Sequence, residues 1–322
     1  MATVLVFVTA ADGAIDRVSL QGLTLGVSLA AGGSVHALLI GDASLALELG
    51  GWGAGTVHVA EHPALASFAP DASARIVDDL ATALGATVVV GPGTETGNTV
   101  MARAAARAGL PFAANCVAAT AGDPLVVTRQ RWGGSLLEQA TIHADRAILT
   151  VAPHVLSAVA TGGTATVQSF TPTLEEADLA VRVVGRIPVP VAGVSLAEAK
   201  VVVTGGRGAG SAQGFAPVVE LADLLGAAVG CSRAVTISGW RPHTDQVGQT
   251  GTKIAPDLYI ACGVSGATQH MAGCKGARRV LAVNKDPEAP IMTAADYAVI
   301  GDLHEVLPAI SAEIRRVRGE VG

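Results

Sequence analysis

The amino-acid sequence predicts an α/β protein of two domains, each built around a parallel sheet flanked by helices. The chain has 322 residues, whereas a single hydrophobic core usually stops growing at roughly 250–300 residues. Half of the residues are apolar and only 15% are charged. The apolar residues fall in short Val, Leu and Ile runs between glycine turns, as in strands that are buried on both faces. Because these runs alternate with helical segments, we expect parallel βαβ units and a doubly wound sheet.

The first part of the chain is expected to hold buried strands with helices between them. Each strand ends at a glycine or a polar turn, and the strands span residues 3–8, 35–41, 56–60 and 86–91. Helical spacing of Ile76, Leu80 and Leu84 predicts a helix between the last two of them. A helix rich in alanine and arginine follows the fourth strand and ends at a glycine and a proline. After about residue 115 the sequence predicts a strand, a Gly-Gly turn and a further pair of strands.

A domain boundary is predicted within residues 182–200. Pro188 and Pro190 favour an extended chain there and cannot continue a helix. The strand–helix alternation starts again beyond them. The sequence therefore predicts an N-terminal domain over residues 1–190 and a C-terminal domain over residues 196–322.

The second domain is expected to repeat the same alternation. A strand and glycine loop over 201–210 precede a helix within 217–230, and three more buried strands are expected at 258–263, 280–284 and 297–302. A last helix ends the chain. Its predicted apolar stripe consists of Leu303, Val306, Leu307, Ile310, Ile314 and Val317. Three arginines at its C-terminal end suit the helix dipole.

Several classes of protein are excluded or disfavoured. No stretch approaches the roughly 20 apolar residues that a membrane-spanning helix needs. Residues 200–322 hold 12 basic and 11 acidic residues, so we expect no basic stripe for nucleic acid. The four cysteines form no C-x-x-C motif and are expected to be buried free thiols. The N-terminus has no signal-peptide or transit-peptide character, which favours the cytoplasm.

A ligand site is expected beyond the carboxyl ends of the C-terminal strands, where open parallel sheets bind ligands. Glycine, serine and asparagine follow these strands, and the longest irregular stretch, "GCSRAVTISGWRPHTDQVGQTGTK", belongs to the same edge. Single residues allow two interpretations. Ser265 could cap a helix or bind a phosphate. His270 could be structural or functional. Asp302 could hydrogen-bond a ribose hydroxyl or cap the last helix.

Together these residues indicate a site for a long, polar, phosphate-bearing ligand. The sequence shows no nucleophile with a base partner and no hydrolase, deaminase or Walker signature. No metal-ligand set is evident either. A bound cofactor is therefore expected to carry the chemistry.

The C-terminal region closely resembles the alpha subunit of electron transfer flavoprotein. The motifs that carry the resemblance are "VVVTGGRG", "AAVGCSRA", "DQVGQTGTKIAPDLYIACGVSGATQH" and "AVNKDPEAPIMTAADYAVIGDL". The N-terminal part resembles the family more loosely, through its strand starts and "RWGGSLL…ILTVAP". The resemblance implies a C-terminal, Rossmann-like FAD-binding domain. It also implies a nucleotide-binding-like N-terminal domain that supports the subunit interface.

The resemblance further implies a one-electron carrier rather than a stand-alone enzyme. Such a chain pairs with a beta subunit that commonly bears AMP or a flavin. Flavin dehydrogenases, typically the acyl-CoA dehydrogenases of fatty acid oxidation, donate electrons, and a membrane quinone oxidoreductase commonly accepts them. Some relatives instead bifurcate electrons from NADH between ferredoxin and a quinone or enoyl-CoA. An NAD-dependent enzyme on a similar fold is the alternative from another class, but no acid–base residue or dinucleotide fingerprint supports it.

The resemblance assigns FAD contacts residue by residue. Thr250 is expected to hydrogen-bond flavin N5, Arg233 to lie against the isoalloxazine, and His270 to approach N1 and O2. A guanidinium and an imidazole there would stabilise negative charge on the reduced flavin. The full predicted set is Arg207, Ser232, Arg233, Gln246, Val247, Gly248, Gln249, Thr250, Gly251, Ser265, Gly266, Ala267, Thr268, Gln269, His270, Asn284, Asp302 and Leu303. The sequence departs from the family at "VTISGW", which lacks the expected acidic residue at the rim of the site.

Overall fold

The computed structural model describes residues 1–11, 13–134, 136–185 and 194–319. The chain divides into two compact units, Met1–Ile187 and Pro188–Gly322. Pro188 and Pro190, on which the predicted boundary rests, lie outside the described residues. Each unit is α/β, as the sequence predicts, and each is described by itself.

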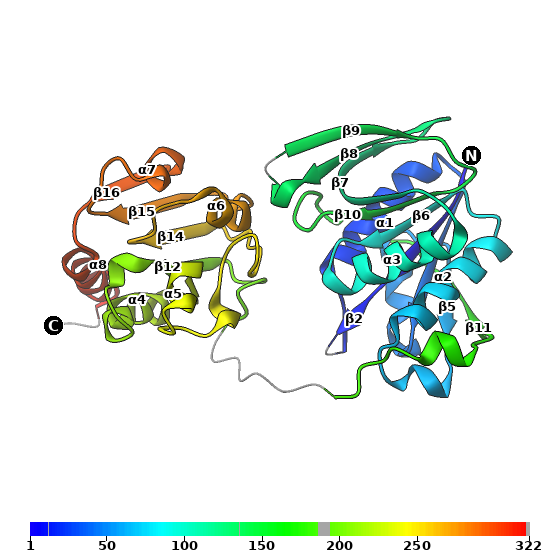
Figure 1. The fold of residues 1–322 in the computed structure, drawn as a ribbon, viewed down its shortest axis with the longest axis horizontal. Coiled ribbons are helices and arrows are strands. Elements are labelled where there is room, and N and C mark those ends of the chain that lie inside the picture. The colour runs from blue at the N-terminus through cyan, green and yellow to red at the C-terminus, as the bar shows by residue number, and fades with distance from the viewer. Residues whose placement is uncertain (12, 135, 186–193, 320–322) are drawn as a thin grey trace. The chain divides into compact units, whose positions relative to one another are not determined.

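The N-terminal unit is built on a nine-stranded sheet with the order β11-β5-β4-β1-β6-β10-β7-β8-β9. The strands from β11 to β7 are parallel, whereas β8 and β9 add an antiparallel hairpin at one edge (Figure 1). The strands are β1 (Thr3–Val8), β4 (Ser34–Ile40), β5 (Thr56–Ala60), β6 (Val88–Pro92), β7 (Phe112–Thr120), β8 (Leu125–Arg131), β9 (Leu136–Ile142), β10 (Ala147–Val151) and β11 (Thr166–Phe170). A small separate ribbon pairs β2 (Ala10–Ala11) with β3 (Ala14–Ile15).

Alternating side chains of the central strand divide the N-terminal core into two layers. Val4, Val6 and Val8 of β1 pack with α1 (Arg17–Ala30) on one face of the sheet. Leu5 and Phe7 point to the other face, against α2 (Pro70–Ala83) and α3 (Glu95–Ala108). Helices therefore cover both faces, which explains why the strands read as continuous apolar runs.

The C-terminal unit has a five-stranded, fully parallel sheet with the order β13-β12-β14-β15-β16. Its strands are β12 (Val201–Gly205), β13 (Ala228–Cys231), β14 (Leu258–Cys262), β15 (Val280–Asn284) and β16 (Tyr297–Ile300). Side chains of α4 (Ala216–Leu225), α5 (Arg233–Ile237) and α8 (Leu303–Arg318) join the core on one face. Those of α6 (Thr268–Cys274) and α7 (Pro290–Ala294) join it on the other (Figure 1).

Two details of the predicted C-terminal core are wrong. The strand at 297–302 is not buried: Tyr297 and Ile300 are 63% and 66% exposed, because β16 is the edge strand of the sheet. Val317 is 71% exposed. The buried residues of α8 are four positions apart: Leu303, Leu307 and Ser311. Val317 does not continue this series, so its side chain lies to one side of the buried face of the helix.

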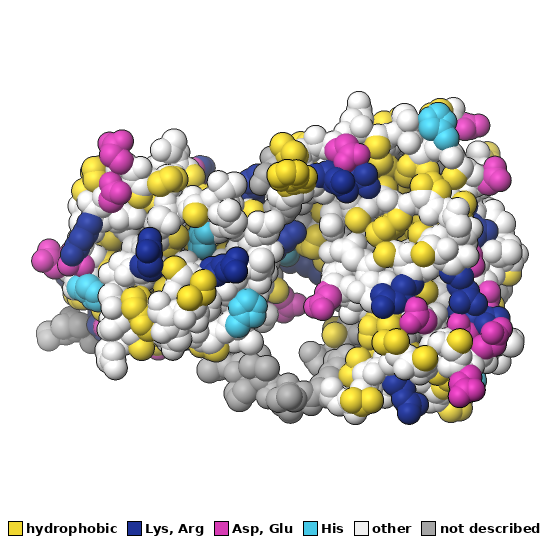
Figure 2. All heavy atoms as spheres, in the orientation of Figure 1, with side chains coloured by type: hydrophobic (Ala, Val, Ile, Leu, Met, Phe, Trp, Pro, Cys, Tyr) yellow, Lys and Arg dark blue, Asp and Glu magenta, His cyan; other side chains and the backbone are white. Residues whose placement is uncertain are grey.

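The four cysteines are free and buried, as the sequence predicts. Burial raises the pKa of each thiol to about 12. None of the helices in the described parts of the chain combines the length and apolar character needed to cross a bilayer. On the face that Figure 2 shows, acidic and basic side chains are interspersed rather than gathered by sign.

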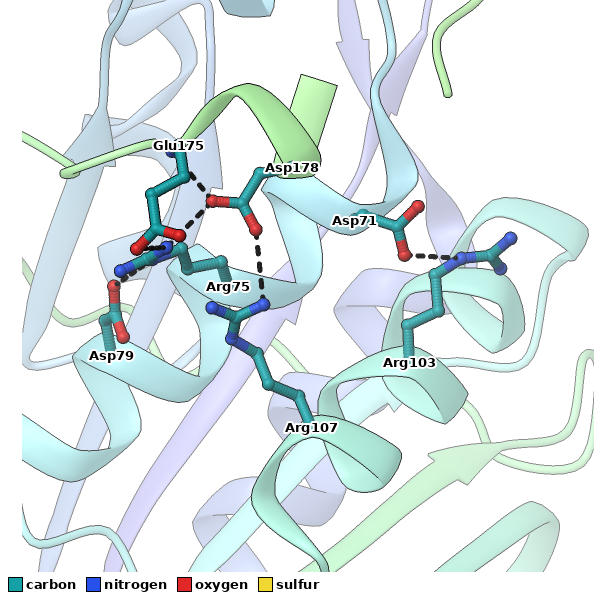
Figure 3. A network of polar contacts seen from close by, with 7 residues as sticks. All are labelled: Asp71, Arg75, Asp79, Arg103, Arg107, Glu175 and Asp178. Carbon is teal, nitrogen blue, oxygen red and sulfur yellow. Dashed lines mark hydrogen bonds and ion pairs between the residues drawn. The ribbon is translucent and has the colours of Figure 1, made fainter. Parts of the chain in front are cut away.

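A buried carboxylate near the C-terminal end of the first unit forms ion pairs with two of its helices (Figure 3). Asp178 follows Glu175 in a short 3-10 turn, and its side chain is only 5% exposed. It accepts the Glu175 backbone N–H at 2.9 Å and forms ion pairs with Arg75 of α2 at 2.9 Å and Arg107 of α3 at 3.2 Å. Burial acts to raise the Asp178 pKa, but the backbone N–H and the two guanidinium groups outweigh it and lower the pKa.

Replacing Asp178 with asparagine should destabilise the N-terminal unit, because two arginines lose their shared partner. Removing one partner of a fully buried pair costs about 3–5 kcal/mol; here we expect about 2 kcal/mol, since the arginines partly reach water. Thermal unfolding should show a lower Tm at pH 7. The matched control is Asp71→Asn, which breaks the half-exposed pair with Arg103 and should change the Tm little.

The same comparison should depend on pH in a defined direction. The folded-state pKa of Asp178 is lower than that of the unfolded chain, so the unfolded chain takes up the proton first as the pH falls. The stabilisation is complete above about pH 4 and disappears as the pH drops through the lowered folded pKa. A Tm difference that is absent at pH 7, or that grows in acid, would contradict this role of Asp178.

Candidate cofactor-binding site

A cavity of about 530 Å³ opens beyond the carboxyl ends of the C-terminal strands. All of its wall comes from this one unit. The lining residues are Arg207, Gly208, Ser232, Arg233, Ala234, Ile237, Gln246, Val247, Gly248, Gln249, Thr250, Gly263, Val264, Ser265, Ala267, Gln269, His270, Asn284, Asp286 and Ala289. The cavity therefore lies at the edge where a parallel sheet is expected to bind its ligand.

At this site the loops after β12 and β14 are in backbone contact through their glycines. The Gly206 N–H donates to Cys262 O at 2.8 Å, and the Gly208 N–H donates to Gly263 O at 3.0 Å. A Cβ on either Gly206 or Gly208 would collide with the Gly263 backbone. Gly263 itself has φ +61°, in the left-handed region that glycine adopts without strain. Only glycine lets the loops after β12 and β14 lie this close.

A buried amide orients the hydroxyl of Thr250. Gln246 is 2% exposed, and its Nε2 donates to Thr250 Oγ1 at 3.0 Å while the Thr236 hydroxyl donates to its Oε1 at 2.8 Å. Because Thr250 Oγ1 accepts from Gln246, its own proton is free to be donated into the cavity. Thr250 is thus a directed hydrogen-bond donor on the cavity wall.

His270 is a neutral imidazole on the same wall. It is 7% exposed, and burial lowers its pKa to about 4 against a smaller, raising effect of the Val247 backbone. Its Nε2 lies 2.6 Å from the Tyr259 hydroxyl. Its Nδ1 is buried and has no hydrogen-bond partner among the described residues.

Two arginines bring positive charge to the cavity. Within the described ranges neither Arg207 nor Arg233 pairs with a carboxylate.

The carboxylate on the wall, Asp286, accepts the Glu288 backbone N–H at 2.9 Å. The Asn284 side chain stabilises the loop after β14 by donating to Val264 O at 2.9 Å. No group of three or more His, Cys, Asp or Glu side chains in the part of the chain that the structure describes could hold a metal ion.

Most of the residues assigned from the sequence line the cavity together. Those that do not appear on its wall are Gly251, Gly266, Thr268, Asp302 and Leu303. Asp302 caps α8 by accepting the His304 N–H at 2.9 Å, and it pairs with Lys285 at 2.8 Å. The N-cap of α6 is Ala267 rather than Ser265, so Ser265 is no helix cap.

The wall also contains residues outside the set of predicted FAD contacts. Gly208, Gly263, Val264 and Asp286 lie in the strand-end loops that the sequence places at the site, although the resemblance assigns them no FAD contact. Ala234, Ile237 and Ala289 lie in or beside α5 and α7, helices of five residues that the sequence does not predict. Ile237 is 75% exposed and belongs to "VTISGW", the stretch in which the family's acidic residue was expected.

These groups fit a dinucleotide cofactor such as FAD. Closely packed glycine loops at strand ends admit a pyrophosphate, and unpaired guanidinium groups favour a ligand with negative charge. The Thr250 hydroxyl, which Gln246 orients, is a donor suited to the polar edge of a ring system. The donor set is adapted to binding and to electrostatic tuning, not to metal ligation.

Comparison with known proteins gives the family. A family described as "Electron transfer flavoprotein domain" matches residues 4–175, and "Electron transfer flavoprotein FAD-binding domain" matches residues 195–275. A protein of Bacillus subtilis (strain 168), named electron transfer flavoprotein subunit alpha, is 35% identical over 312 residues, covering 95% of each chain. Proteins of the same name from Mycobacterium tuberculosis (strain H37Rv) and Mycobacterium leprae (strain TN) are 38% and 36% identical over 320 and 324 residues. Each match covers 99% of this chain and 100% of the relative.

These matches confirm both the family and the cofactor that the C-terminal motifs predict. The chain belongs to the electron transfer flavoprotein family, as an alpha subunit with an FAD-binding domain.

Proposed function

We propose that the chain carries electrons one at a time from flavin dehydrogenases, such as acyl-CoA dehydrogenases, to a membrane quinone oxidoreductase. As an alpha subunit it is expected to work with a beta subunit. The observation that carries the proposal is the composition of the cavity wall. Two exposed arginines and the Thr250 hydroxyl lie on this wall beside one carboxylate, Asp286, and none of the described polar groups of the wall forms a nucleophile–base pair.

The cavity disfavours an NAD-dependent enzyme. Such an enzyme needs an acid–base residue poised over the nicotinamide. The histidine on the wall, His270, has its pKa lowered to about 4 by burial and already contacts Tyr259. The acid on the wall, Asp286, accepts a backbone N–H within its own turn.

The residues of the chain would bind and tune the flavin. When bound, FAD accepts and releases the electrons. Arg233 stays protonated at any relevant pH and would stabilise negative charge at the flavin. The Thr250 hydroxyl, oriented by Gln246, would donate to N5. His270 would face N1 and O2, and the glycine loops after β12 and β14 would admit the pyrophosphate.

The proposed function predicts reduction by an acyl-CoA dehydrogenase. The chain should purify with its beta subunit as a yellow complex. Adding a catalytic amount of an acyl-CoA dehydrogenase with its acyl-CoA substrate should bleach the flavin absorbance, and neither component alone should do so. A complex that is reduced only by NADH, with ferredoxin as a required acceptor, would replace this proposal with electron bifurcation. A colourless complex would contradict both.

Replacing Arg233 with alanine should lower the first reduction potential of the bound flavin and weaken FAD binding by roughly tenfold, about the effect of one charge-assisted hydrogen bond. Spectroelectrochemical titration and fluorescence measurement of FAD release check the two effects. The matched control is Arg278→Ala, which removes a surface arginine of the same unit that is 79% exposed. Equal redox behaviour of the two variants would refute the role of Arg233.

Replacing Thr250 with valine should change the flavin spectrum during stepwise reduction while leaving the fold intact. The substitution keeps the shape of the side chain and removes the donor that Gln246 orients. Thr244→Val is the control, because Thr244 is an exposed threonine of the same stretch outside the cavity wall. If the spectra of the Thr250→Val protein match those of wild type at every stage, the N5 assignment is wrong.

A further inference from the structure

A threonine outside the cavity wall begins a chain of hydrogen bonds that ends on the wall. Thr236 lies in α5, is partly buried, and is not among the residues that line the cavity. Its Oγ1 lies 2.8 Å from Gln246 Oε1, and Gln246 Nε2 lies 3.0 Å from Thr250 Oγ1. Gln246 is 2% exposed. The chain therefore connects α5 to the Thr250 hydroxyl through a buried amide.

Thr236 has two acceptors within reach and only one proton. Its Oγ1 lies 2.9 Å from Arg233 O as well as 2.8 Å from Gln246 Oε1. A hydroxyl carries one proton and two lone pairs, so it makes a full hydrogen bond to one of these oxygens at a time. A bond to the carbonyl three residues earlier is one that helical threonines readily form. When Gln246 does not take the Thr236 proton, Arg233 O can accept it.

The same heavy atoms therefore support two directions of the chain. In the outward direction, which the structure has, Thr236 donates to Gln246 Oε1, Nε2 donates to Thr250, and Thr250 donates into the cavity. In the inward direction the amide is turned over, so that Nε2 donates to Thr236 and Thr236 donates to Arg233 O. Thr250 then donates to Oε1 and accepts from the cavity. Each hydrogen bond joins one donor to one acceptor in both directions, and every proton stays on its own atom.

We propose that Thr236 is a positioning residue that lets Thr250 act toward the flavin either as a donor or as an acceptor. The choice of flavin atom, N5, rests on the function proposed above. N5 of oxidised flavin has a lone pair, whereas N5 of fully reduced flavin carries a proton. The outward direction suits the first and the inward direction suits the second. Without the Thr236 hydroxyl, one end of a buried amide has no partner in either direction, which destabilises both arrangements.

The orientation of the Gln246 amide can be measured in the wild-type complex. The full chain, deuterated and purified with its beta subunit, carries ¹⁵N in the glutamine side chains and ¹H–¹³C in the threonine methyl groups. The nuclear Overhauser effect from the amide protons is stronger to the methyl group of the threonine that Nε2 faces. The methyl signals are those that disappear in Thr236→Ser and Thr250→Ser. We expect the stronger effect at Thr250 in the oxidised complex and at Thr236 after full reduction with dithionite; one orientation in both states would overturn the proposal.

Replacing Thr236 with valine tests the role of its hydroxyl. The substitution keeps the shape of the side chain and removes both the proton and the lone pairs. It should weaken the binding of oxidised and of fully reduced FAD by the same factor, about three- to tenfold, the effect of losing one hydrogen bond. Fluorescence measures the first affinity, and the second follows from the two-electron midpoint potential of bound against free FAD. That potential should therefore stay at its wild-type value.

Two controls accompany this variant. Thr236→Ser keeps the hydroxyl and should bind FAD as the wild-type protein does. Ser238→Ala should also leave FAD binding unchanged, because Ser238 is an exposed residue at the end of α5 whose hydroxyl donates to Ala234 O. Loss of affinity for oxidised FAD alone, with a raised midpoint potential, would mean that Thr236 supports only the outward direction, and would overturn the proposal. Unchanged affinity in Thr236→Val would overturn the positioning role.

These measurements separate failure of the proposal from failure of the proposed function. Dithionite replaces the electron donor, so the result does not depend on which dehydrogenase reduces the protein. Unchanged flavin spectra in Thr250→Val would refute the N5 assignment, whereas changed spectra with an amide that keeps one orientation would overturn the reversal alone. If Thr236→Val does not fold, the amide orientation in the wild-type complex still decides the question.

Discussion

The cofactor site depends on the contact between the backbones that follow β12 and β14. Gly206 and Gly208 touch the Cys262–Gly263 backbone through two hydrogen bonds, at a distance that leaves no room for a Cβ. This contact holds the ends of the central strands level with each other. The loops after β12 and β14 carry Arg207 and Ser265, and both residues line the cavity. A side chain at this contact would force apart the two loops that carry Arg207 and Ser265.

The electrostatics of the wall follow from what is buried behind it. Gln246 and Tyr259 are covered by the core, and each uses its hydrogen-bonding group on a residue that faces the cavity. In the described part of the chain, the two arginines of the wall, Arg207 and Arg233, form no ion pair with a carboxylate. The Thr250 hydroxyl is therefore oriented by a buried amide, whereas the positive charge of the wall is on exposed arginine side chains. The site is arranged in advance for a ligand whose charge changes.

The sequence predicted the central strands well because they are buried on both faces. β5 and β15 have the predicted bounds, since an apolar run between polar turns marks such a strand in local sequence. The exposure of β16 was missed because it depends on strand order, which is not local. α5 and α7 are too short for helical periodicity. The strand-end rule found the loops of the site, but the contact of Tyr259 with His270 joins a strand to a helix. Nothing in the spacing of those two residues shows that their side chains meet.

The burial of the cysteines has a practical consequence for the chemistry near the flavin site. Cys231 and Cys262 end β13 and β14, directly before wall residues, yet burial raises their pKa to about 12. Thiolate, which attacks disulfides and electrophiles, is therefore scarce at neutral pH. The four thiols should react slowly with alkylating reagents while the protein is folded. A single cysteine introduced on the surface would then be a uniquely addressable position for a spectroscopic label.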